Sequence, residues 1–367
     1  MHVLVTADTV GGVWTYTREL VTGLTQRGIR VTLVSFGEIP GANQTEWLNA
    51  LGIVDFYPTA FRLEWMQDAE DDLKASSDYL LRIIDEKKPD LLHCGEYAYG
   101  ALPVDVPKVV VGHSDVISWW VAVHGHEPES NSWIEGYRQI VARGLAGADV
   151  VVTPSRWMLQ ALGKHYGKND AGRVIYNGRN PGLFNAHTTK EDLVVGVGRA
   201  WDAGKQLQLL SMIQSPWPVV VAGSDEHPDP AYPGRKFTVS GQLLFRGELN
   251  EAELRHLYTR ASIFVGTSRY EPFGLTPLEA AFSRCALVLN DIPSFREIWG
   301  ESACYFQTND ADDLERVLRS LAEDRQLRLT YANLAYRRAA SLYTAHRMID
   351  QYVQLYDALV PEKMAAA

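Results

Sequence analysis

The sequence predicts an α/β protein made of two domains, each built around a parallel β-sheet. The chain has 367 residues, about twice the usual size of one domain. Short runs rich in β-branched residues alternate with longer helical segments, the pattern typical of βαβ units. Residues 172–192, rich in Gly, Asn and Pro, interrupt the alternation and are interpreted as a linker. We therefore expect two Rossmann-like halves, with ligands bound in a cleft where the carboxyl ends of their strands face each other.

The first half opens with a strand followed by an amphipathic helix. That helix is predicted to follow Gly11 and Gly12 and to end near Gln26, because its apolar residues recur every three to four positions. Gly28, just after it, is the expected stop. The predicted strands of this half are residues 2–6, 30–36, 53–57, 90–94, 108–112 and 149–153.

The second half repeats the alternation and ends in helices. Asn250 and Glu253 have the spacing of a capping box at the start of one of them. The segment from Asp312 to Leu359 is predicted to be helical, with Tyr352 and Tyr356 on one side of its last helix. The predicted strands of this half are residues 193–198, 218–223, 243–247, 262–267, 286–290 and 303–306.

Composition excludes several classes of protein. A net charge of -10 argues against a nucleic-acid binder, which carries a basic face, and against binding to anionic lipid through a polybasic segment. A local basic patch and peripheral contact with a membrane stay open. The first residues are typical of a β-strand and not of a signal peptide, and no apolar run approaches the ~20 residues of a membrane span. Three cysteines, Cys94, Cys285 and Cys304, are scattered in or beside apolar runs, so we expect buried free thiols in a reducing cytoplasm.

The stretch "EPFGLTPLE", which starts at Glu271, joins a β-rich run to a helix and has two interpretations. In the first, Thr276 is an N-cap, Pro277 takes the first helical position and Glu279 completes a capping box. In the second, the loop binds a ligand, because backbone N–H groups ahead of a helix are unpaired and the dipole is positive there. Gly274 would let a phosphate or sugar hydroxyls approach the backbone, and Glu271 could accept bonds from the hydroxyls.

The same stretch resembles the Glu-x7-Glu signature of the retaining family 4 glycosyltransferases, which have the GT-B fold. "VGVGRAWDAGK" resembles the strand of that family that precedes an Arg and a Lys, here Arg199 and Lys205, although Gln206 stands where the family often has Gly. "DTVGGVWTYTREL" is similar to its N-terminal glycine loop, and "VVVGHSD" to the strand that ends in its active-site histidine, here His113. "ADVVVTPSRWMLQAL", "VIYNGRN" and the run from "LLFRGELN" to the first glutamate also match, in the right order.

The resemblance implies a retaining transfer of a sugar from a nucleotide diphosphate to an acceptor. It assigns catalytic roles to four residues: Arg199 and Lys205 hold the diphosphate, Glu271 binds sugar hydroxyls, and His113 orients the sugar. Attack is expected on the front face, with the departing phosphate oxygen taking the proton of the acceptor, so that no protein base is needed.

The resemblance also implies donor-binding residues, among which Glu279 would bind the ribose. It implies a domain over residues 1–170, with the helix at about 344–360 crossing back onto it, and a donor-binding domain over 171–343. The donor-binding residues are Gly11, Gly12, Arg246, Gly247, Phe273, Gly274, Leu275, Thr276 and Glu279.

Trp119 and Trp120, in a segment after His113 that has no clear periodicity, are candidates for the wall that holds the acceptor. Aromatic faces pack well against sugar rings, but the same side chains could anchor a loop on the core. The acceptor itself is open: a small molecule, a glycan or a lipid-linked sugar.

No metal and no cofactor other than the nucleotide sugar are expected. His93, His124, His126 and Glu127 have no compact zinc spacing. Asp310, the start of the one Asp-x-Asp, is expected to cap a helix instead of binding a metal.

A UDP-sugar is the expected donor because such donors are common in the family, while no residue distinguishes UDP from GDP or ADP. Three alternatives are weighed: a GT-B sugar-nucleotide 2-epimerase, a non-catalytic nucleotide-sugar-binding protein, and an NAD-dependent dehydrogenase. The last would require a dinucleotide fingerprint, and the sequence lacks the G-x-G-x-x-G pattern.

Overall fold

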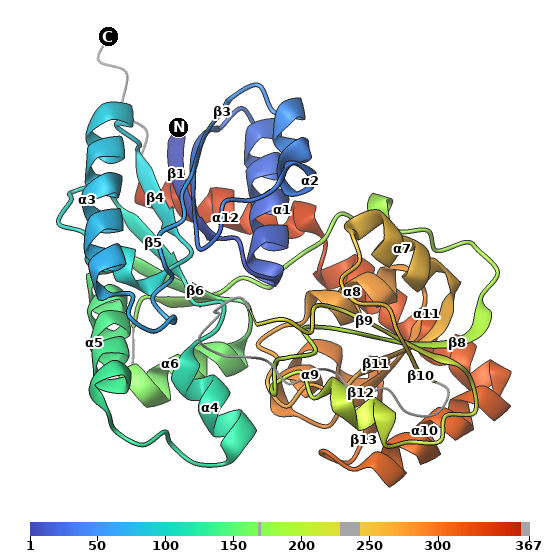
Figure 1. Ribbon diagram of the computed structural model, residues 1–367. Coiled ribbons are helices and arrows are strands. Elements are labelled where there is room, and N and C mark those ends of the chain that lie inside the picture. Colours follow the sequence, from blue (N-terminus) through green and yellow to red (C-terminus); the bar gives the residue numbers. More distant parts are fainter. Residues whose placement is uncertain (168–169, 228–242, 361–367) are drawn as a thin grey trace. The chain divides into compact units, whose positions relative to one another are not determined.

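A computed structural model of the chain describes residues 1–167, 170–227 and 243–360. The chain divides into two compact units (Figure 1). The first unit comprises Met1–Val121, His126–Gly178 and the segment from Ala345 onward, and the second comprises Ala122–Gly125 and Arg179–Thr344. The sequence places the passage between the halves after residue 170, whereas the structure has it after Gly178.

The first unit contains a seven-stranded parallel sheet, in the order β3-β2-β1-β4-β5-β6-β7, within the described residues (Figure 1). The six strands predicted for this half are confirmed to within two residues at each end. β7 lies inside the segment interpreted as a linker, because three residues that begin with Gly and Arg are too short to show a period. The strands are β1 (His2–Asp8), β2 (Arg30–Phe36), β3 (Val54–Pro58), β4 (Leu91–Cys94), β5 (Lys108–Val111), β6 (Val150–Thr153) and β7 (Gly172–Val174).

Helices cover both faces of this sheet, because each strand turns alternate side chains to opposite faces. Val3 and Val5 of β1 share one core with residues of α1 and α12, whereas Leu4 shares another core with residues of α3, α5 and α6. Figure 1 shows α1 and α12 on one side of the sheet and α3 and α5 on the other. The helices of this unit are α1 (Gly12–Gln26), α2 (Ala42–Thr45), α3 (Glu70–Lys87), α4 (Val116–His124), α5 (Ser132–Gly147), α6 (Arg156–Tyr166) and α12 (Ala345–Leu359), with 3-10 turns η1 (Glu46–Ala50) and η2 (Tyr97–Ala101).

The second unit contains a six-stranded parallel sheet, in the order β10-β9-β8-β11-β12-β13, within its described residues. The strands predicted for this half are again confirmed to within two residues at each end. Every residue of the two strands β11 and β12 is buried, which explains why the sequence of each is a nearly continuous apolar run. The strands are β8 (Glu191–Val197), β9 (Val219–Ala222), β10 (Leu243–Phe245), β11 (Ala261–Gly266), β12 (Ala286–Asn290) and β13 (Cys304–Phe306).

Two predicted helix caps of the second unit are confirmed. Asn250 and Glu253 form the reciprocal capping box of α7. Asp310 accepts a hydrogen bond of 3.0 Å from the amide of Asp313 at the start of α10. The helices of this unit are α7 (Glu251–Arg260), α8 (Leu275–Phe282), α9 (Pro293–Trp299), α10 (Ala311–Glu323) and α11 (Arg325–Leu342), with 3-10 turns η3 (Pro181–Leu183), η4 (Leu207–Ser211) and η5 (Gly300–Ser302).

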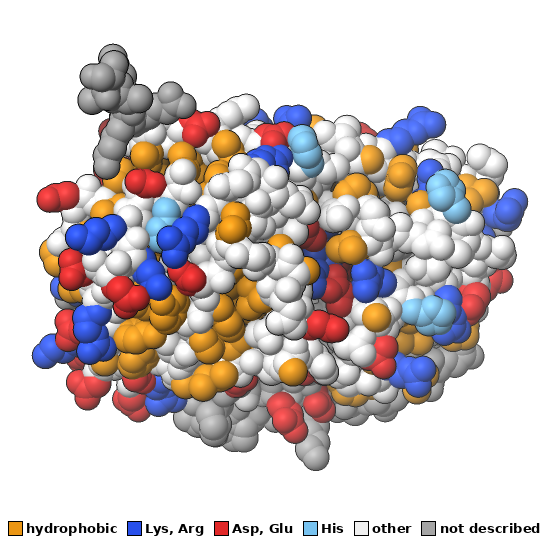
Figure 2. All heavy atoms as spheres, turned by 90° about the horizontal axis from the view of Figure 1, so that it is seen from above, with side chains coloured by type: hydrophobic (Ala, Val, Ile, Leu, Met, Phe, Trp, Pro, Cys, Tyr) orange, Lys and Arg blue, Asp and Glu red, His pale blue; other side chains and the backbone are white. Residues whose placement is uncertain are grey.

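The surface and the thiols agree with the composition. Figure 2 shows acidic and basic side chains interspersed over the face in view, with no broad area of one sign. Cys94 and Cys285 are buried free thiols and Cys304 is partly buried. Among the helices of the described residues, none is both long and apolar enough to span a bilayer.

Candidate functional site

The turn between β11 and α8 is shaped by Gly274. This residue has φ +90°, and a Cβ placed on it would lie 2.9 Å from Cγ of Pro277, so a larger side chain does not fit. Gly274 is the residue before the helix, which begins at Leu275, and no side chain caps this end. The capping-box interpretation is therefore wrong. Thr276 lies inside the helix, because the glycine conformation ends the loop one residue before the position that would make Thr276 the N-cap.

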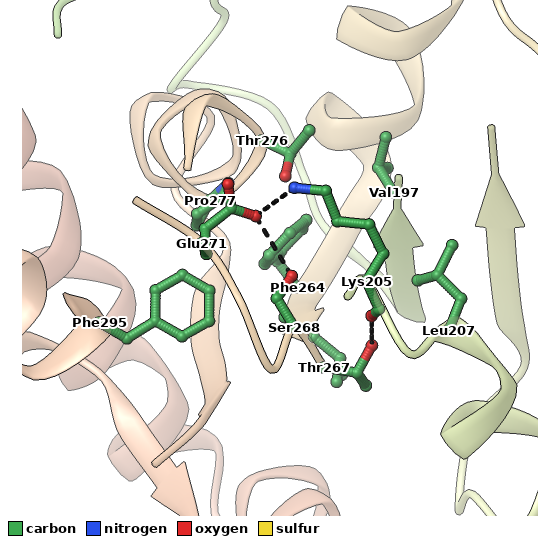
Figure 3. A pocket seen from close by; sticks show the side chains of 12 residues that line it. Val197, Lys205, Leu207, Phe264, Thr267, Ser268, Glu271, Thr276, Pro277 and Phe295 are labelled. Carbon is green, nitrogen blue, oxygen red and sulfur yellow. Dashed lines mark hydrogen bonds and ion pairs between the residues drawn. The ribbon is translucent and has the colours of Figure 1, made fainter. Parts of the chain in front are cut away.

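A short ion pair lies directly beside this turn (Figure 3). Nζ of Lys205, in the segment that follows β8, is 2.5 Å from Oε2 of Glu271, and Ser268 donates to the same oxygen over 3.2 Å. The backbone fixes the position of the lysine, since Thr267 donates through its hydroxyl to the carbonyl of Lys205 over 2.8 Å. Both charged side chains are mostly buried, with 19% and 11% of their surfaces exposed. The structure thus brings together two residues that the sequence assigns to catalysis.

Lys205 and Glu271 line a small cavity together with Thr276, Pro277 and Phe295 (Figure 3). Its volume is about 10 Å³, room for about one water molecule. The hydroxyl-bearing Thr276 of the first turn of α8 thus shares a wall with the ammonium and the carboxylate. A positive side chain and the positive end of a helix meet here, an arrangement that suits an anion.

Arg199 takes a different position from Lys205. Its Nη2 lies 2.6 Å from Oδ2 of Asp202, and its guanidinium carbon is 5.0 Å from the ring centre of Trp201. Asp202 is buried and also accepts from the amide of Gly204 over 2.8 Å, which tightens the turn that leads to Lys205. Arg199 is not among the residues that line the cavity beside Lys205. Its assignment to the diphosphate stays a prediction.

Glu279 is also paired with a cation, and this cation is a residue that the sequence analysis does not single out. Nε of Arg179 lies 2.9 Å from Oε1 of Glu279, while Nη2 of Arg179 lies 2.7 Å from Oε1 of Glu251. Arg179 is 1% exposed. The one sequence signal for it is the Arg of "NGRN" within the segment interpreted as a linker.

The other predicted donor residues of the second unit offer mainly backbone. Phe273 is buried, with its ring packed edge-on against Tyr343 at 5.4 Å between centres, so its side chain belongs to the core. Gly247 follows β10 with φ +67°, and its carbonyl accepts from the amide of Gly223 over 2.8 Å. Arg246 beside it is exposed.

In the first unit, the predicted residues lie at the carboxyl ends of strands. Gly11 has φ +75° and directly precedes α1, whose first residue is Gly12. His113 follows β5, and its ring packs edge-on against Tyr16 of α1 with 4.4 Å between ring centres. Burial lowers the pKa of His113 to about 4, so the imidazole is neutral at pH 7. Neutral imidazole can orient a substrate by hydrogen bonds, but it brings no positive charge.

A second buried histidine joins α1 and α12 behind His113. Nδ1 of His93 lies 2.6 Å from the hydroxyl of Tyr356, and Nε2 lies 3.1 Å from the hydroxyl of Tyr16. Burial and the neighbouring His113 lower the pKa of His93 to about 3. Both ring nitrogens of His93 are therefore hydrogen-bonded to tyrosine hydroxyls, and the residue has a structural role at the strand end.

Trp119 and Trp120 lie in α4, so the expectation of a segment without regular structure is wrong. The run is too apolar to show a helical period, which is why the sequence pattern does not reveal it. The two rings are half-buried and pack edge-on, with centres 6.4 Å apart. Whether they hold an acceptor stays a prediction.

The histidines weighed as metal ligands are engaged elsewhere. Nδ1 of His126 lies 2.8 Å from the carbonyl oxygen of Glu127, whose carboxylate also pairs with Arg138 over 2.6 Å. Within residues 1–167, 170–227 and 243–360, no group of three or more His, Cys, Asp or Glu side chains is placed to hold a metal ion.

Comparison with known proteins identifies two family models that follow each other along the chain. The model described as "Glycosyltransferase Family 4" matches residues 10–183, and the one described as "Glycosyl transferases group 1" matches residues 187–338. The two matches include His113, Arg179, Arg199, Lys205, Glu271 and Glu279.

Similar proteins agree with these models. A lipopolysaccharide core biosynthesis mannosyltransferase of Rhizobium leguminosarum bv. viciae is 30% identical over 33% of this chain and 35% of its own length. The GDP-mannose:cellobiosyl-diphosphopolyprenol alpha-mannosyltransferase of Komagataeibacter xylinus is 29% identical over 64% of this chain and 61% of its own length. Both matches span less than two thirds of the relative. The sucrose-phosphate synthase of Thermosynechococcus elongatus has a similar fold, with a TM-score of 0.78 at 18% identity over 98% of this chain and 99% of that one.

Proposed function

Because the chain belongs to glycosyltransferase family 4 and has the GT-B fold, we propose that it transfers a sugar from a nucleoside-diphosphate sugar to an acceptor hydroxyl. The observation that carries the proposal is the contact of 2.5 Å between Lys205 and Glu271 at the start of α8. An ammonium, a carboxylate and the amide end of a helix that no side chain caps suit a ligand that joins phosphate to sugar hydroxyls.

Binding of the donor would rearrange this pair. The cavity beside it has room for about one water molecule, so a diphosphate needs the ammonium of Lys205 to turn from Glu271 toward a phosphate oxygen. Glu271 would then accept hydrogen bonds from sugar hydroxyls, with Ser268 still donating to it. Each charged group exchanges one partner for another of suitable charge or polarity, so neither is left buried and unpaired.

The proposed reaction retains the configuration of the anomeric carbon. The bond between that carbon and the β-phosphate oxygen breaks, with the electron pair going to the phosphate. The acceptor oxygen forms the new bond on the same face, and its proton passes to the departing phosphate oxygen. Lys205 stabilises the charge that builds up on the leaving group, an effect that is large in a site shielded from water.

The neutral His113 fits this proposal as a residue that orients the sugar by hydrogen bonding. No residue is needed as general base, because the leaving group takes the proton. The reaction as proposed uses no metal, since the positive charge near the phosphates comes from Lys205, Arg199 and the helix amides.

For the base and the sugar of the donor, we propose chemical classes and not single compounds. The sequence predicts UDP, which stays a prediction. The two relatives described above are named mannosyltransferases, and the name of one specifies GDP-mannose as its donor. These names support a hexose as the transferred sugar and make GDP-mannose and UDP-hexoses the first donors to compare. They also support a saccharide acceptor, free or lipid-linked.

The test is release of nucleoside diphosphate from a panel of UDP-, GDP- and ADP-hexoses, with and without saccharide acceptors. Transfer requires release that depends on the acceptor, and the anomeric coupling constant of the product reports retention. Conversion of the donor to its 2-epimer without an acceptor would instead indicate an epimerase. Binding without turnover on any acceptor would contradict the proposal in favour of a binding protein.

A further inference from the structure

Arg179 lies beside two of the points where the chain passes between its units. One of these passages lies between Gly178 and Arg179, and the other lies between Thr344 and Ala345. The amide of Arg179 donates to the carbonyl of Tyr343 over 3.1 Å, and Arg179 forms a parallel β-bridge with Thr344. The backbone of Arg179 is therefore fixed on the second unit by the segment that leads out of it.

The side chain of Arg179 lies between two helices of the second unit. It contacts Glu251 at the start of α7 and Glu279 inside α8, with N–O distances of 2.7 Å and 2.9 Å. The guanidinium carbon also lies 5.5 Å from the ring centre of Phe184. A guanidinium that is 1% exposed has to be neutralised where it lies, because a buried unpaired charge is strongly unfavourable.

The charges of this group indicate what Glu279 can bind. Two carboxylates and one guanidinium leave one negative charge, which repels phosphate and favours groups that donate hydrogen bonds. The guanidinium of Arg179 lies between the two carboxylates, with Nε 2.9 Å from Oε1 of Glu279 and Nη2 2.7 Å from Oε1 of Glu251, and so holds Glu279 by charge at one oxygen. A carboxylate held in this way is preorganised for hydroxyl donors and does not lose side-chain freedom when a ligand binds.

We infer that Arg179 is a positioning residue for the nucleotide, which holds Glu279 in the orientation that accepts hydrogen bonds from the ribose hydroxyls of the donor. This inference rests on the proposed function, since contact of Glu279 with the ribose is part of the donor site assumed there. It adds Arg179, which directly follows the passage after Gly178, to the residues that determine nucleotide recognition.

The experiment compares binding of UDP and GDP with binding of their 2′-deoxy and 3′-deoxy counterparts by calorimetry. The variant Arg179→Lys keeps the charge but loses the planar guanidinium. It should bind the preferred ribonucleotide about tenfold more weakly, as expected for loss of a hydrogen bond to a charged group, and the deoxy form almost as well as before. The matched control is Arg338→Lys, because Arg338 donates to the carbonyl of Glu297 over 3.2 Å, away from Glu279. The control should keep the affinities of the wild type.

A second comparison keeps the test valid if Arg179→Lys does not fold. The double variant Arg179→Gln with Glu279→Gln removes both members of the pair, and the carboxylate of Glu251 that loses Arg179 is 33% exposed to solvent. Because Arg179 acts through Glu279, the double variant should bind the ribonucleotide as weakly as Glu279→Gln alone.

Two results would overturn the inference: an unchanged ratio of ribose to deoxyribose affinity in Arg179→Lys, or losses that add in the double variant. A purely structural role would weaken both ligands alike or lower only the melting temperature. Failure of the wild type to bind any nucleoside diphosphate would instead reject the proposed function, and the inference with it.

Discussion

The ammonium of Lys205 and the carboxylate of Glu271 are in contact at 2.5 Å, although 66 residues separate them in the sequence. The two residues come from loops that follow the neighbouring strands β8 and β11. Parallel strands present their carboxyl ends at one edge of the sheet, so this contact follows from the topology. Each of the two charged groups neutralises the other.

Replacing Lys205 by Ala should lower turnover by about a hundredfold or more, the loss seen when one donor to a developing oxyanion is removed. The measurement is acceptor-dependent release of nucleoside diphosphate at saturating donor. Arg316→Ala removes an exposed ion pair with Asp313 in the same unit and serves as the control that keeps full activity. Near-normal turnover of the Lys205 variant would show that the diphosphate is bound elsewhere.

Replacing Gly274 by Ala should destabilise the second unit and reduce activity. The added Cβ would meet Pro277 at 2.9 Å in a backbone conformation with φ +90°, which costs about 1–2 kcal/mol or more for a residue with a side chain. The matched change Gly136→Ala lies in helix α5, where a Cβ meets nothing within 4 Å, and should stabilise by about 0.5–1 kcal/mol. Chemical denaturation of both variants checks the opposite signs, and equal effects would contradict the strained turn.

The free energy of unfolding should depend on pH through His93. Its pKa falls from 6.5 to about 3 on folding, so the unfolded chain binds the extra proton between these values. This contribution is fully present above about pH 6.5 and is lost as the pH falls toward 3, at up to about 1.4 kcal/mol per pH unit. The variant His93→Gln cannot titrate and should lose less stability than the wild type between pH 6.5 and pH 4.

The comparison with a variant is needed because other buried groups titrate in the same range. Burial lowers the pKa of His113 to about 4, which adds to the effect of His93. Burial raises the pKa of Glu64 to about 7, so its contribution has the opposite sign and is lost as the pH rises through 7. Urea denaturation of the wild type and of His93→Gln at a series of pH values gives the difference between their free energies of unfolding. If this difference does not change with pH, folding does not shift the pKa of His93, and the prediction is wrong.

Chelation of divalent cations should leave the reaction rate unchanged. In the proposed mechanism, protein cations and helix amides supply the positive charge at the phosphates, so no metal enters the transition state. Turnover in excess EDTA, compared with turnover in added Mg²⁺ or Mn²⁺, measures this directly. Loss of activity with EDTA and its recovery with one of the ions would reject a metal-free transfer.

Much of the fold could be predicted because the sequence of a buried parallel strand is a short run rich in β-branched residues. The pairing of Lys205 with Glu271 could be expected only from the resemblance, since it depends on the register of two loops. The start of α8 could not be predicted from propensity, because Thr276 is a better N-cap than Gly274 by residue type. The conformation of Gly274 decided the outcome, and a sequence does not reveal backbone angles.

Arg179 shows the other limit of prediction. Its partner Glu251 is 72 residues away, and its local sequence has the composition of a loop. Nothing in such a segment indicates a fully buried charge, because burial here comes from the meeting of α7, α8 and the segment that ends at Thr344. Long-range packing, and not local pattern, made this residue part of the site.

The placement of α12 has a consequence for the folding of the chain during its translation. Tyr352 and Tyr356 fill the core beside β1 and α1, yet they are translated after the whole second unit. When only the first 178 residues have left the ribosome, one face of the sheet of the first unit therefore lacks the side chains of α12 that cover it. The first unit can complete its folding only after more than 160 further residues have left the exit tunnel, as the second unit spans Arg179–Thr344. Until then its apolar face is a natural substrate for chaperones.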